Sequence, residues 1–592
     1  MHYPARGRVC AHLFAPVLAL TVSCSGSIPD DTAETPGGPG AGGSAGPPGA
    51  GALGGGGNNT VPGRGGAGSG AGVGGAAGGS LSSNPGASGV ALKGTPAFHR
   101  FVRLTHEQWE ASVRDLLRLA AVPGLSAGFA GDPPNGSFTN NERALFVSST
   151  LWGDYQRAAE TLAAQITSDT QALSKLTGGS TDSAAFIRTF GRRTFRRPLT
   201  QAEEQRYQTL FAAGPSVVGS GNAFADGVRL VLESMLQSPK FVYRSELGND
   251  GAPLGGFEMA SKLSFLIRNT TPDDTLLDAA ASGELDSAQG VLARATAMLE
   301  TPAAKEAIGR YHAELFGLSR YGSIDKNRTK FPAYSEALNV EFERADRMFF
   351  DRVFMLGRGL REILTSPVAF VSTASAPLYG VKVSGSGLVE TQLGPERPGF
   401  LTRLGYLAYN ANLSEPDPIH RGVDILNRLM CLDLLPPANV DIPPVPAAQP
   451  GQTNRERVTA HTGDGTCGQG CHSTLINPVG FAFENFDALG QFRTTDNGKS
   501  IDTSGVVALK DGLKSFNGAP ELATVLASAP SVHGCYVKHM TEFALARDTT
   551  TADRGLVDAI EGSSMNEDAS IKTMLLQIIA HPSFLTRTGG AQ

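Results

Sequence analysis

One short run holds the residues with the clearest capacity for chemistry, Cys467-Gly-Gln-Gly-Cys471-His472. A c-type haem is attached by two cysteine sulfurs that add to its vinyl groups, and the histidine after the second cysteine ligates the iron. The order of residues fits, although three residues separate the cysteines where the common motif has two. We therefore expect haem c on Cys467 and Cys471, with His472 as the proximal iron ligand.

Cysteine pairs also serve other chemistries, and three of them remain open here. Cys467 and Cys471 can form a disulfide with each other, or either can pair with Cys431 or Cys535, in an oxidising compartment. A zinc ion can use both cysteines of the run with His472 or His461, although adjacent Cys and His side chains rarely reach one tetrahedral ion. Buried thiols with no partner are the third alternative.

The sixth iron ligand decides what a haem in this position does. A strong ligand makes the domain an electron carrier, whereas an open position permits peroxide or oxygen chemistry, so whether the chain is an enzyme stays open. His461 is the first choice because it lies close in sequence, and Met540 is the second. His533 and His539 are further candidates, although Met540 and His539 also fit a helical core.

The other cysteines divide between the N-terminus and the C-terminal part of the chain. Cys10 lies inside an apolar N-terminal segment and Cys24 at its end. With the cysteines of the haem run set aside, Cys431 and Cys535 are left to pair with each other, a use that suits an oxidising compartment.

The first 24 residues predict an export signal. Two arginines precede a short apolar run that ends at Ser23-Cys24, and the run is too short to span a bilayer as an ordinary helix. Because a small residue precedes Cys24, the segment resembles a bacterial lipoprotein signal, in which the cysteine is lipidated. Thr21 stands where such signals prefer Leu. We expect an exported protein, periplasmic or at the cell surface, anchored to the outer membrane through Cys24. Plain secretion is the alternative.

Residues 25–95 are mostly Gly, Ala, Ser and Pro, a composition typical of a disordered tether. The net charge of -6 offers no basic field for nucleic acid, so we expect no nucleic-acid partner. An unknown redox partner or a polymer substrate remains the expected interaction.

The rest of the chain reads as mainly α-helical. Thr105 with Gln108, and Thr200 with Glu203, have the spacing of capping boxes, and helical periodicity recurs while strand-like alternation is scarce. We expect a multi-helical body with a C-terminal cytochrome-c-like segment. The predicted divisions are a signal peptide at 1–24, a linker at 25–95, an N-terminal helical domain at 96–248, a central helical domain at 249–390, a cysteine-containing cytochrome-c-like domain at 391–512 and a C-terminal helical domain at 513–592.

Three further sets of residues receive structural interpretations. The basic cluster of Arg188, Arg192, Arg193, Arg196 and Arg197 is expected to be solvated or salt-bridged on helix faces. Glu484 and Asp487 are expected to cap or brace a helix. Both tryptophans, Trp109 and Trp152, are expected on buried helix faces, which argues against a carbohydrate platform of exposed rings.

A set of short motifs extends over nearly the whole body. They are Arg103-Leu104-Thr105 with Asp115-Leu116-Leu117, Phe195-Arg196-Arg197-Pro198-Leu199-Thr200, Met235-Leu236-Gln237-Ser238-Pro239-Lys240-Phe241, Leu378-Tyr379-Gly380-Val381, His420-Arg421-Gly422, and Asn477-Pro478-Val479-Gly480-Phe481 with Glu484-Asn485-Phe486-Asp487. Together they resemble exported multidomain proteins of planctomycetes and myxobacteria, built from the domains of unknown function 1592, 1588, 1595, 1587 and 1585.

The resemblance implies a surface or periplasmic location and a cytochrome-like cysteine segment preceded by a histidine that matches His461. It implies no known reaction. This chain departs from the pattern in the extra residue between the cysteines, in Asn477 where Asp is usual, and in Ala546-Arg547 where Gly-Arg is common.

The sequence thus predicts a tethered, exported haem c protein in extracytoplasmic electron transfer or oxidation. The competing hypothesis is a non-enzymatic surface protein, structural or polysaccharide-binding, whose cysteines form disulfides.

Overall fold

The structure is a computed structural model that describes residues 89–93, 100–249, 251–435, 443–463, 465–466 and 468–587. The predicted signal peptide, Cys24, nearly all of the predicted linker and Cys467 lie outside the described residues.

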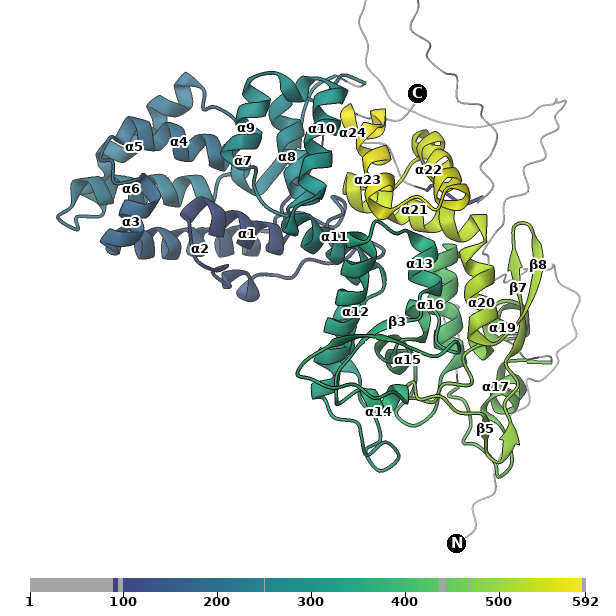
Figure 1. The fold of residues 1–592 in the computed structure, drawn as a ribbon. Coiled ribbons are helices and arrows are strands. Elements are labelled where there is room, and N and C mark those ends of the chain that lie inside the picture. Colours follow the sequence, from purple (N-terminus) through teal and green to yellow (C-terminus); the bar gives the residue numbers. More distant parts are fainter. Residues whose placement is uncertain are drawn as a thin grey trace, which may run out of the picture. The chain divides into compact units, whose positions relative to one another are not determined.

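The described residues are mainly helical, as predicted (Figure 1). The N-terminal helices are α1 (His106–Leu117), α2 (Ser149–Ser168), α3 (Thr170–Thr177), α4 (Ser183–Phe195), α5 (Gln201–Val217), α6 (Ala223–Leu236) and α7 (Pro239–Val242). The central helices are α8 (Gly256–Ile267), α9 (Asp274–Ala281), α10 (Ala288–Leu299), α11 (Pro302–Leu315), α12 (Ala337–Met355), α13 (Leu360–Thr365) and α14 (Ala376–Tyr379).

The helices of the C-terminal part are shorter around the cysteines and longer after them. They are α15 (Leu404–Tyr409), α16 (Pro418–Met430), α17 (Asn454–Thr462), α18 (Gln469–Cys471), the π-helical turn η5 (His472–Ile476), α19 (Asn477–Phe481), α20 (Gly518–Ala527), α21 (Pro530–Leu545), α22 (Arg554–Asn566), α23 (Ile571–Ala580) and α24 (Pro582–Leu585).

The described strands form antiparallel pairs only. They are β1 (Arg100–Arg103) with β2 (Tyr243–Glu246), β3 (Val368–Val371) with β4 (Val389–Gln392), β5 (Thr495–Asp496) with β6 (Lys499–Ser500), and β7 (Ser504–Leu509) with β8 (Gly512–Asn517). These pairs tie loops to the helical body.

Local sequence signals set the starts of two helices. The Thr105 side chain accepts a hydrogen bond from the Gln108 backbone N–H and so caps α1. The Gln108 side chain accepts one from the Thr105 backbone N–H in turn. Thr200 and Glu203 form the same reciprocal pair at the start of α5. Each capping box satisfies backbone N–H groups that the first helical turn leaves without partners, which confirms both predicted boundaries.

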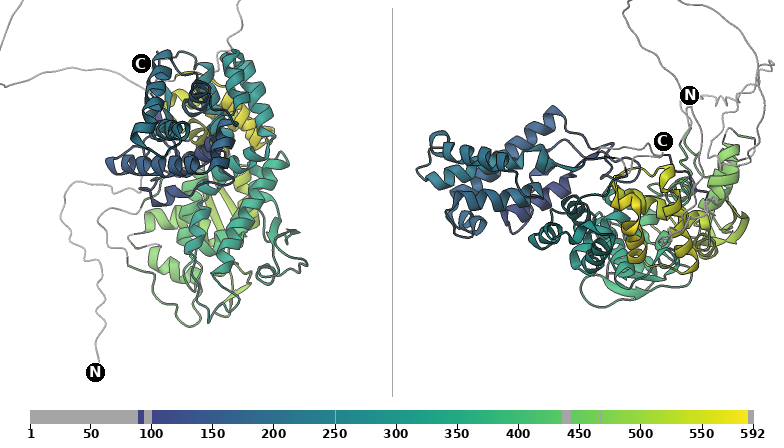
Figure 2. Two further views of the ribbon diagram at one scale, coloured as in Figure 1. Left: turned by 90° about the vertical axis from the view of Figure 1, so that its left-hand side faces the viewer. Right: turned by 90° about the horizontal axis from the view of Figure 1, so that it is seen from above.

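Two apolar cores hold the helices together. One lies among α1 to α6 and includes Trp109 and Tyr155, and the other runs from Leu254 to the C-terminal helices. Helices distant in sequence meet in the second core, where α10 contacts α23 and α16 contacts α21. Figure 2 shows the C-terminal helices against the central ones from two further sides.

Several arginines lie inside the protein and donate to backbone carbonyls. Arg421, on α16, is fully buried and donates to the carbonyls of Phe483, Phe486, Leu407 and Asp487. Arg397 and Arg403 bind carbonyls in the same way. A buried polar group is tolerated when it is hydrogen-bonded, so these side chains fix loops that lack regular ladders.

Two glycines allow α16 to lie directly on the segment after the cysteines. A Cβ on Gly480 would lie 1.8 Å from the Pro418 carbonyl oxygen, and one on Gly422 would lie 2.2 Å from the Ile476 carbonyl oxygen. Both contacts are with backbone atoms, so any side chain at either position would push the two elements apart.

No helix of the described residues is long and apolar enough to cross a membrane.

Candidate functional site

The cysteine–histidine turn is built from α17, α18, η5 and α19, which appear in green in Figure 1. Thr453 and Glu456 form a capping box that begins α17, and α16 packs against α19 and η5. Cys471 ends α18 and His472 begins η5, so the two side chains are adjacent on one helical turn. Both are half-buried.

His472 is held by a short chain of polar side chains. Its Nδ1 lies 3.3 Å from the Oδ1 of Asn477, whose Nδ2 donates to the Thr462 hydroxyl at 2.8 Å. Because the amide nitrogen faces Thr462, the amide oxygen faces His472 and accepts a hydrogen bond from the Nδ1–H group of the ring. The lone pair of the ring therefore lies on Nε2.

Burial is the main cause of a lowered pKa at His472, opposed by the hydrogen bond to Asn477. The charge of a protonated His461 lowers the same pKa further. His472 is thus favoured as a neutral imidazole at pH 7, the form that ligates metals.

The predicted distal ligands stand in different surroundings. His461 is half-buried, and its Nε2 lies 3.0 Å from the Pro443 carbonyl oxygen. Met540 is a buried side chain of α21 in the second core. Both ring nitrogens of His533 have hydrogen-bond partners, Ser564 Oγ at 2.7 Å and the Ala527 carbonyl at 3.0 Å, which leaves no ring nitrogen for iron.

Cys431 and Cys535 are joined by a disulfide, with sulfurs 2.03 Å apart and Cα atoms 5.6 Å apart. The bond links the C-cap of α16 to α21 across a sequence separation of 104 residues, and it pairs the two cysteines that the sequence left over. Cys471 is also disulfide-bonded.

His539 stands beside the first disulfide. Its Nε2 lies 3.4 Å from Cys431 Sγ and its Nδ1 lies 3.3 Å from a Glu542 carboxylate oxygen. The side chains of Cys431, Cys535 and His539 have ligand atoms within 4.8 Å of one another. Because the two sulfurs are bonded to each other, they offer no thiolate to a metal ion here. Cys431 and His539 also border a cavity of about 1140 Å³.

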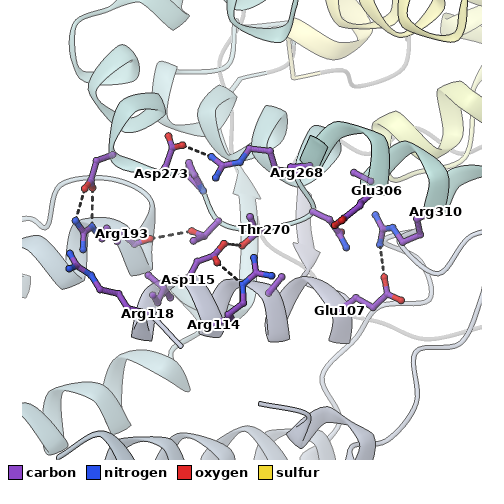
Figure 3. Close-up of a pocket in the computed structure, with 18 of the residues that line it drawn as sticks. Glu107, Arg114, Asp115, Arg118, Arg193, Arg268, Thr270, Asp273, Glu306 and Arg310 are labelled. Carbon is purple, nitrogen blue, oxygen red and sulfur yellow. Dashed lines mark hydrogen bonds and ion pairs between the residues drawn. The ribbon is translucent and has the colours of Figure 1, made fainter. Parts of the chain in front are cut away.

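A second cavity, of about 570 Å³, lies between α1 and the loop after α8, and Figure 3 shows its wall. Its arginines face carboxylates: Arg114 binds Asp115, Arg268 binds Asp273 and Arg193 binds Asp274. Arg310 faces Glu107 at 3.5 Å. The positive charges are largely neutralised within the protein, so this wall has little need of an anionic ligand.

Two structural interpretations from the sequence need correction. Trp152 is 38% exposed, not buried, whereas Trp109 is fully buried as expected. In the basic cluster, Arg192, Arg193 and Arg197 are salt-bridged and Arg188 is exposed, as expected. Arg196 is instead buried and donates to the carbonyls of residues 240, 241 and 243, because it lies in the left-handed C-cap of α4, which turns its side chain toward α7.

The carboxylates after Gly480 are bracing groups. Glu484 is buried and accepts from the Asn454 side chain at 3.0 Å, while Asp487 accepts from the backbone N–H groups of Leu489 and Gln491. Both hold loops of the turn region in place, in agreement with a structural role.

The site and fold define a mainly helical protein with one disulfide staple and a separate cysteine–histidine turn. Five family models match it, each described as a protein of unknown function: DUF1587 at 103–168, DUF1595 at 182–246, DUF1592 at 254–381, DUF1588 at 397–496 and DUF1585 at 512–584. The chain belongs to the group of proteins built from these domains. No curated protein and no solved structure matches it.

The model that covers the cysteine–histidine turn is named PSCyt3, a name that suggests a cytochrome-like domain. The matched range also contains Arg421, which donates to four backbone carbonyls, and the hydrogen-bonded side chains of Thr462, Asn477 and His472. The sequence pointed to Cys471 and His472, but it did not reveal that Thr462 orients Asn477. The feature of the sequence that could have indicated this contact is Asn477, which stands in the motif after the cysteines.

Proposed function

We propose that this chain is an exported haem c protein that transfers electrons outside the cytoplasm, with Cys467 and Cys471 as attachment residues and His472 as the proximal ligand. The observation that carries the proposal is the orientation of His472. Asn477 accepts a hydrogen bond from the Nδ1–H group and leaves Nε2 as the ligand atom, an arrangement typical of metal-binding histidines.

The donor set fits the group. Cys471 and His472, adjacent on one helical turn, would hold the haem through Cys471 Sγ and His472 Nε2, and Thr462 fixes the amide that orients the ring. Haem c supplies one-electron transfer when it is bound. The disulfide at Cys471 has to be reduced before its sulfur can form a thioether, so the protein has to reach its maturation machinery as the dithiol.

His461 is the proposed distal ligand, with Met540 as the second choice. His461 comes from the C-terminal turn of α17, is half-buried and is electrostatically coupled to His472. Its hydrogen bond to the Pro443 carbonyl would have to open if Nε2 is the ligand atom, whereas Nδ1 could ligate without that change. Met540 would have to leave a packed core, which costs about 2–3 kcal/mol of apolar burial.

The proposed location is the outer membrane, on its periplasmic or outer face, through a lipid on Cys24. Its support is the sequence alone, an apolar run followed by Ser23-Cys24. Cell fractionation of the wild type and of Cys24→Ala tests it: membrane association of the wild type that is lost in the variant supports the anchor, and soluble wild type contradicts it.

The test of the function is the visible spectrum of protein matured in a haem-competent exporting host, with pyridine haemochrome analysis. A c-type spectrum is expected for the wild type and for Cys431→Ala/Cys535→Ala, which lacks only the staple. It should be lost in Cys471→Ala. A colourless wild type with two disulfides would overturn the proposal.

The second candidate is a binding or structural surface protein. The observation that favours it is that Cys431, Cys535 and Cys471 are all in disulfides in this structure. The spectrum separates the two candidates, because a binding protein of this kind is colourless whatever its oxidation state.

A further inference from the structure

A third cavity, of about 370 Å³, lies where strand β2 and helices α7 and α8 meet. Aromatic rings form part of its wall: Phe101, Tyr243 and Phe257. Phe101 is 55% exposed and meets Tyr243 edge-on, with ring centroids 6.5 Å apart. Its volume lies at the lower end of the range for small-ligand sites, so it suits one ring rather than an extended molecule.

Positive charge gathers at the same wall. Arg196, Arg197, Lys240 and Arg244 line the cavity, and Glu258 is the acidic group beside them. Arg197 and Lys240 share the Glu203 carboxylate, and Glu258 binds Arg587. The charges of Arg196 and Arg244 are those left to consider.

Among the residues that the structure describes, Arg196 pairs with no carboxylate. It donates to backbone carbonyls, which satisfy its N–H groups and leave its full charge uncompensated. Burial, with the nearby charge of Arg244, lowers the pKa of Arg196 to about 9. The protein thus keeps a buried positive charge at the edge of this cavity without an anion to balance it.

Arg244 is half-buried and, among the described residues, makes no side-chain hydrogen bond and no ion pair within 4.0 Å. Its guanidinium lies 5.3 Å from the centroid of the Phe265 ring, on which it packs. The nearest acidic residue in sequence, Glu246, is already bound by Arg100 and Lys262. Burial lowers the pKa of Arg244 to about 10, against the attraction of Glu246.

One residue that lines the same cavity has an unpartnered hydroxyl. Ser261 of α8 is 7% exposed, lines the cavity, and its Oγ has no hydrogen-bond partner among the described residues. Buried hydroxyls are normally bonded, so an unused hydroxyl and an unused guanidinium nitrogen on two residues that line one cavity indicate a place for a polar ligand group.

We propose that this cavity binds a carboxylate carried on a six-membered ring, with the carboxylate on Arg244 and within reach of the Ser261 hydroxyl, and the ring against Phe101 and Tyr243. Arginine donates two parallel hydrogen bonds to a carboxylate, and the aromatic side chains supply the apolar surface for the ring. A uronic acid unit of an acidic saccharide and a simple aromatic acid share this chemistry. The inference does not depend on haem attachment.

The experiment is isothermal titration of the full chain with glucuronate, benzoate, glucose, acetate and inorganic phosphate. Saturable binding of glucuronate, benzoate or both is expected, and the ligand that binds identifies the source of the ring. Glucose, acetate and phosphate are expected to bind at least about tenfold more weakly, because each lacks the charge or the ring. No saturable binding of either ring carboxylate, or equal binding of acetate or phosphate, would overturn the proposal.

Substitutions locate the binding. Arg244→Gln should raise the Kd about tenfold or more, whereas Arg188→Gln, which removes an equal charge from an exposed position on α4, should leave it unchanged. Phe101→Ala changes an exposed side chain and tests the ring contact if Arg244→Gln does not fold; it should weaken glucuronate or benzoate and leave the weak binding of acetate as it was. Equal affinity of all variants for the ring carboxylate would place the ligand elsewhere.

Discussion

The Cys431–Cys535 bond and the Cys471–His472 turn place the same residue type in opposite surroundings. Cys535 is fully buried on α21 and its bond joins two core helices, whereas Cys471 is half-buried at the end of a three-residue helix. The first location suits a stabilising cross-link, because the bond joins two core helices that are distant in sequence. The second suits chemistry, because a half-buried sulfur beside an oriented imidazole can be reached by a cofactor.

The largest effect should come from removing the core cross-link. Cys431→Ala/Cys535→Ala should lower the free energy of unfolding by about 4 kcal/mol, because the bond closes a loop of 104 residues and restricts the unfolded chain. Guanidinium denaturation without reductant measures it. Cys471→Ala, which removes the disulfide of the cysteine–histidine turn and not the one between core helices, is the matched comparison and should cost less. An equal loss of unfolding free energy in the two variants would contradict the different roles assigned to the two cysteine sites.

A buried carboxyl on the core side of the turn should make stability depend on pH. Burial raises the pKa of Glu484 to about 7, although Arg493 and Arg421 oppose the shift. The folded state then holds a proton that the unfolded state releases near pH 4.5, so this contribution to stability is complete below pH 4.5 and is lost as the pH rises to 7. Relative to Glu484→Gln, the wild type should lose about 3 kcal/mol over that interval.

Urea denaturation of both proteins from pH 4 to pH 8 gives the difference directly, and other buried carboxyls cancel in it. Parallel stability curves would show that Glu484 keeps an ordinary pKa and that water reaches the inner side of the turn.

The contact between α16 and the segment after the cysteines should be the next most sensitive point. Gly480→Ala places a Cβ against the backbone of Pro418 and should cost about 2–3 kcal/mol, since neither backbone can yield easily. Gly470→Ala is the matched control, because a Cβ there meets nothing within 4 Å. Thermal unfolding of the two variants compares them, and a stable Gly480→Ala would mean that the turn shifts freely on α16.

The sequence predicted features whose causes lie within a few residues. Thr105 and Thr200 cap helices through side chains three positions away, and the adjacency of Cys471 and His472 needs only one helical turn. The β7–β8 hairpin was not predicted, because its two turn residues are Lys510 and Asp511 and the Asp-Gly or Asn-Gly pair typical of tight hairpins does not occupy those positions.

Features that depend on distant contacts could not be predicted in this way. Gly480 is explained by Pro418, and the orientation of His472 by Thr462 through Asn477. Arg196 was expected to be solvated or salt-bridged like its neighbours, yet it turns inward because α7 presents carbonyls to it. Trp152 is 38% exposed, because the burial of a helix face depends on which distant elements pack against it.

The smallest expected effect is a change in the pKa of His472, and it tests the cysteine–histidine turn directly. The hydrogen bond to Asn477 raises this pKa against burial, so Asn477→Leu should lower it further. Asn477→Asp should raise it, because a carboxylate in the same place stabilises the imidazolium. NMR titration of ¹³C-labelled histidine measures both, with His420 as an internal reference whose pKa stays raised by Asp417. Opposite shifts in the two variants would establish that position 477 tunes the imidazole. An unchanged His472 in both would remove the orienting contact on which its role as an iron ligand rests.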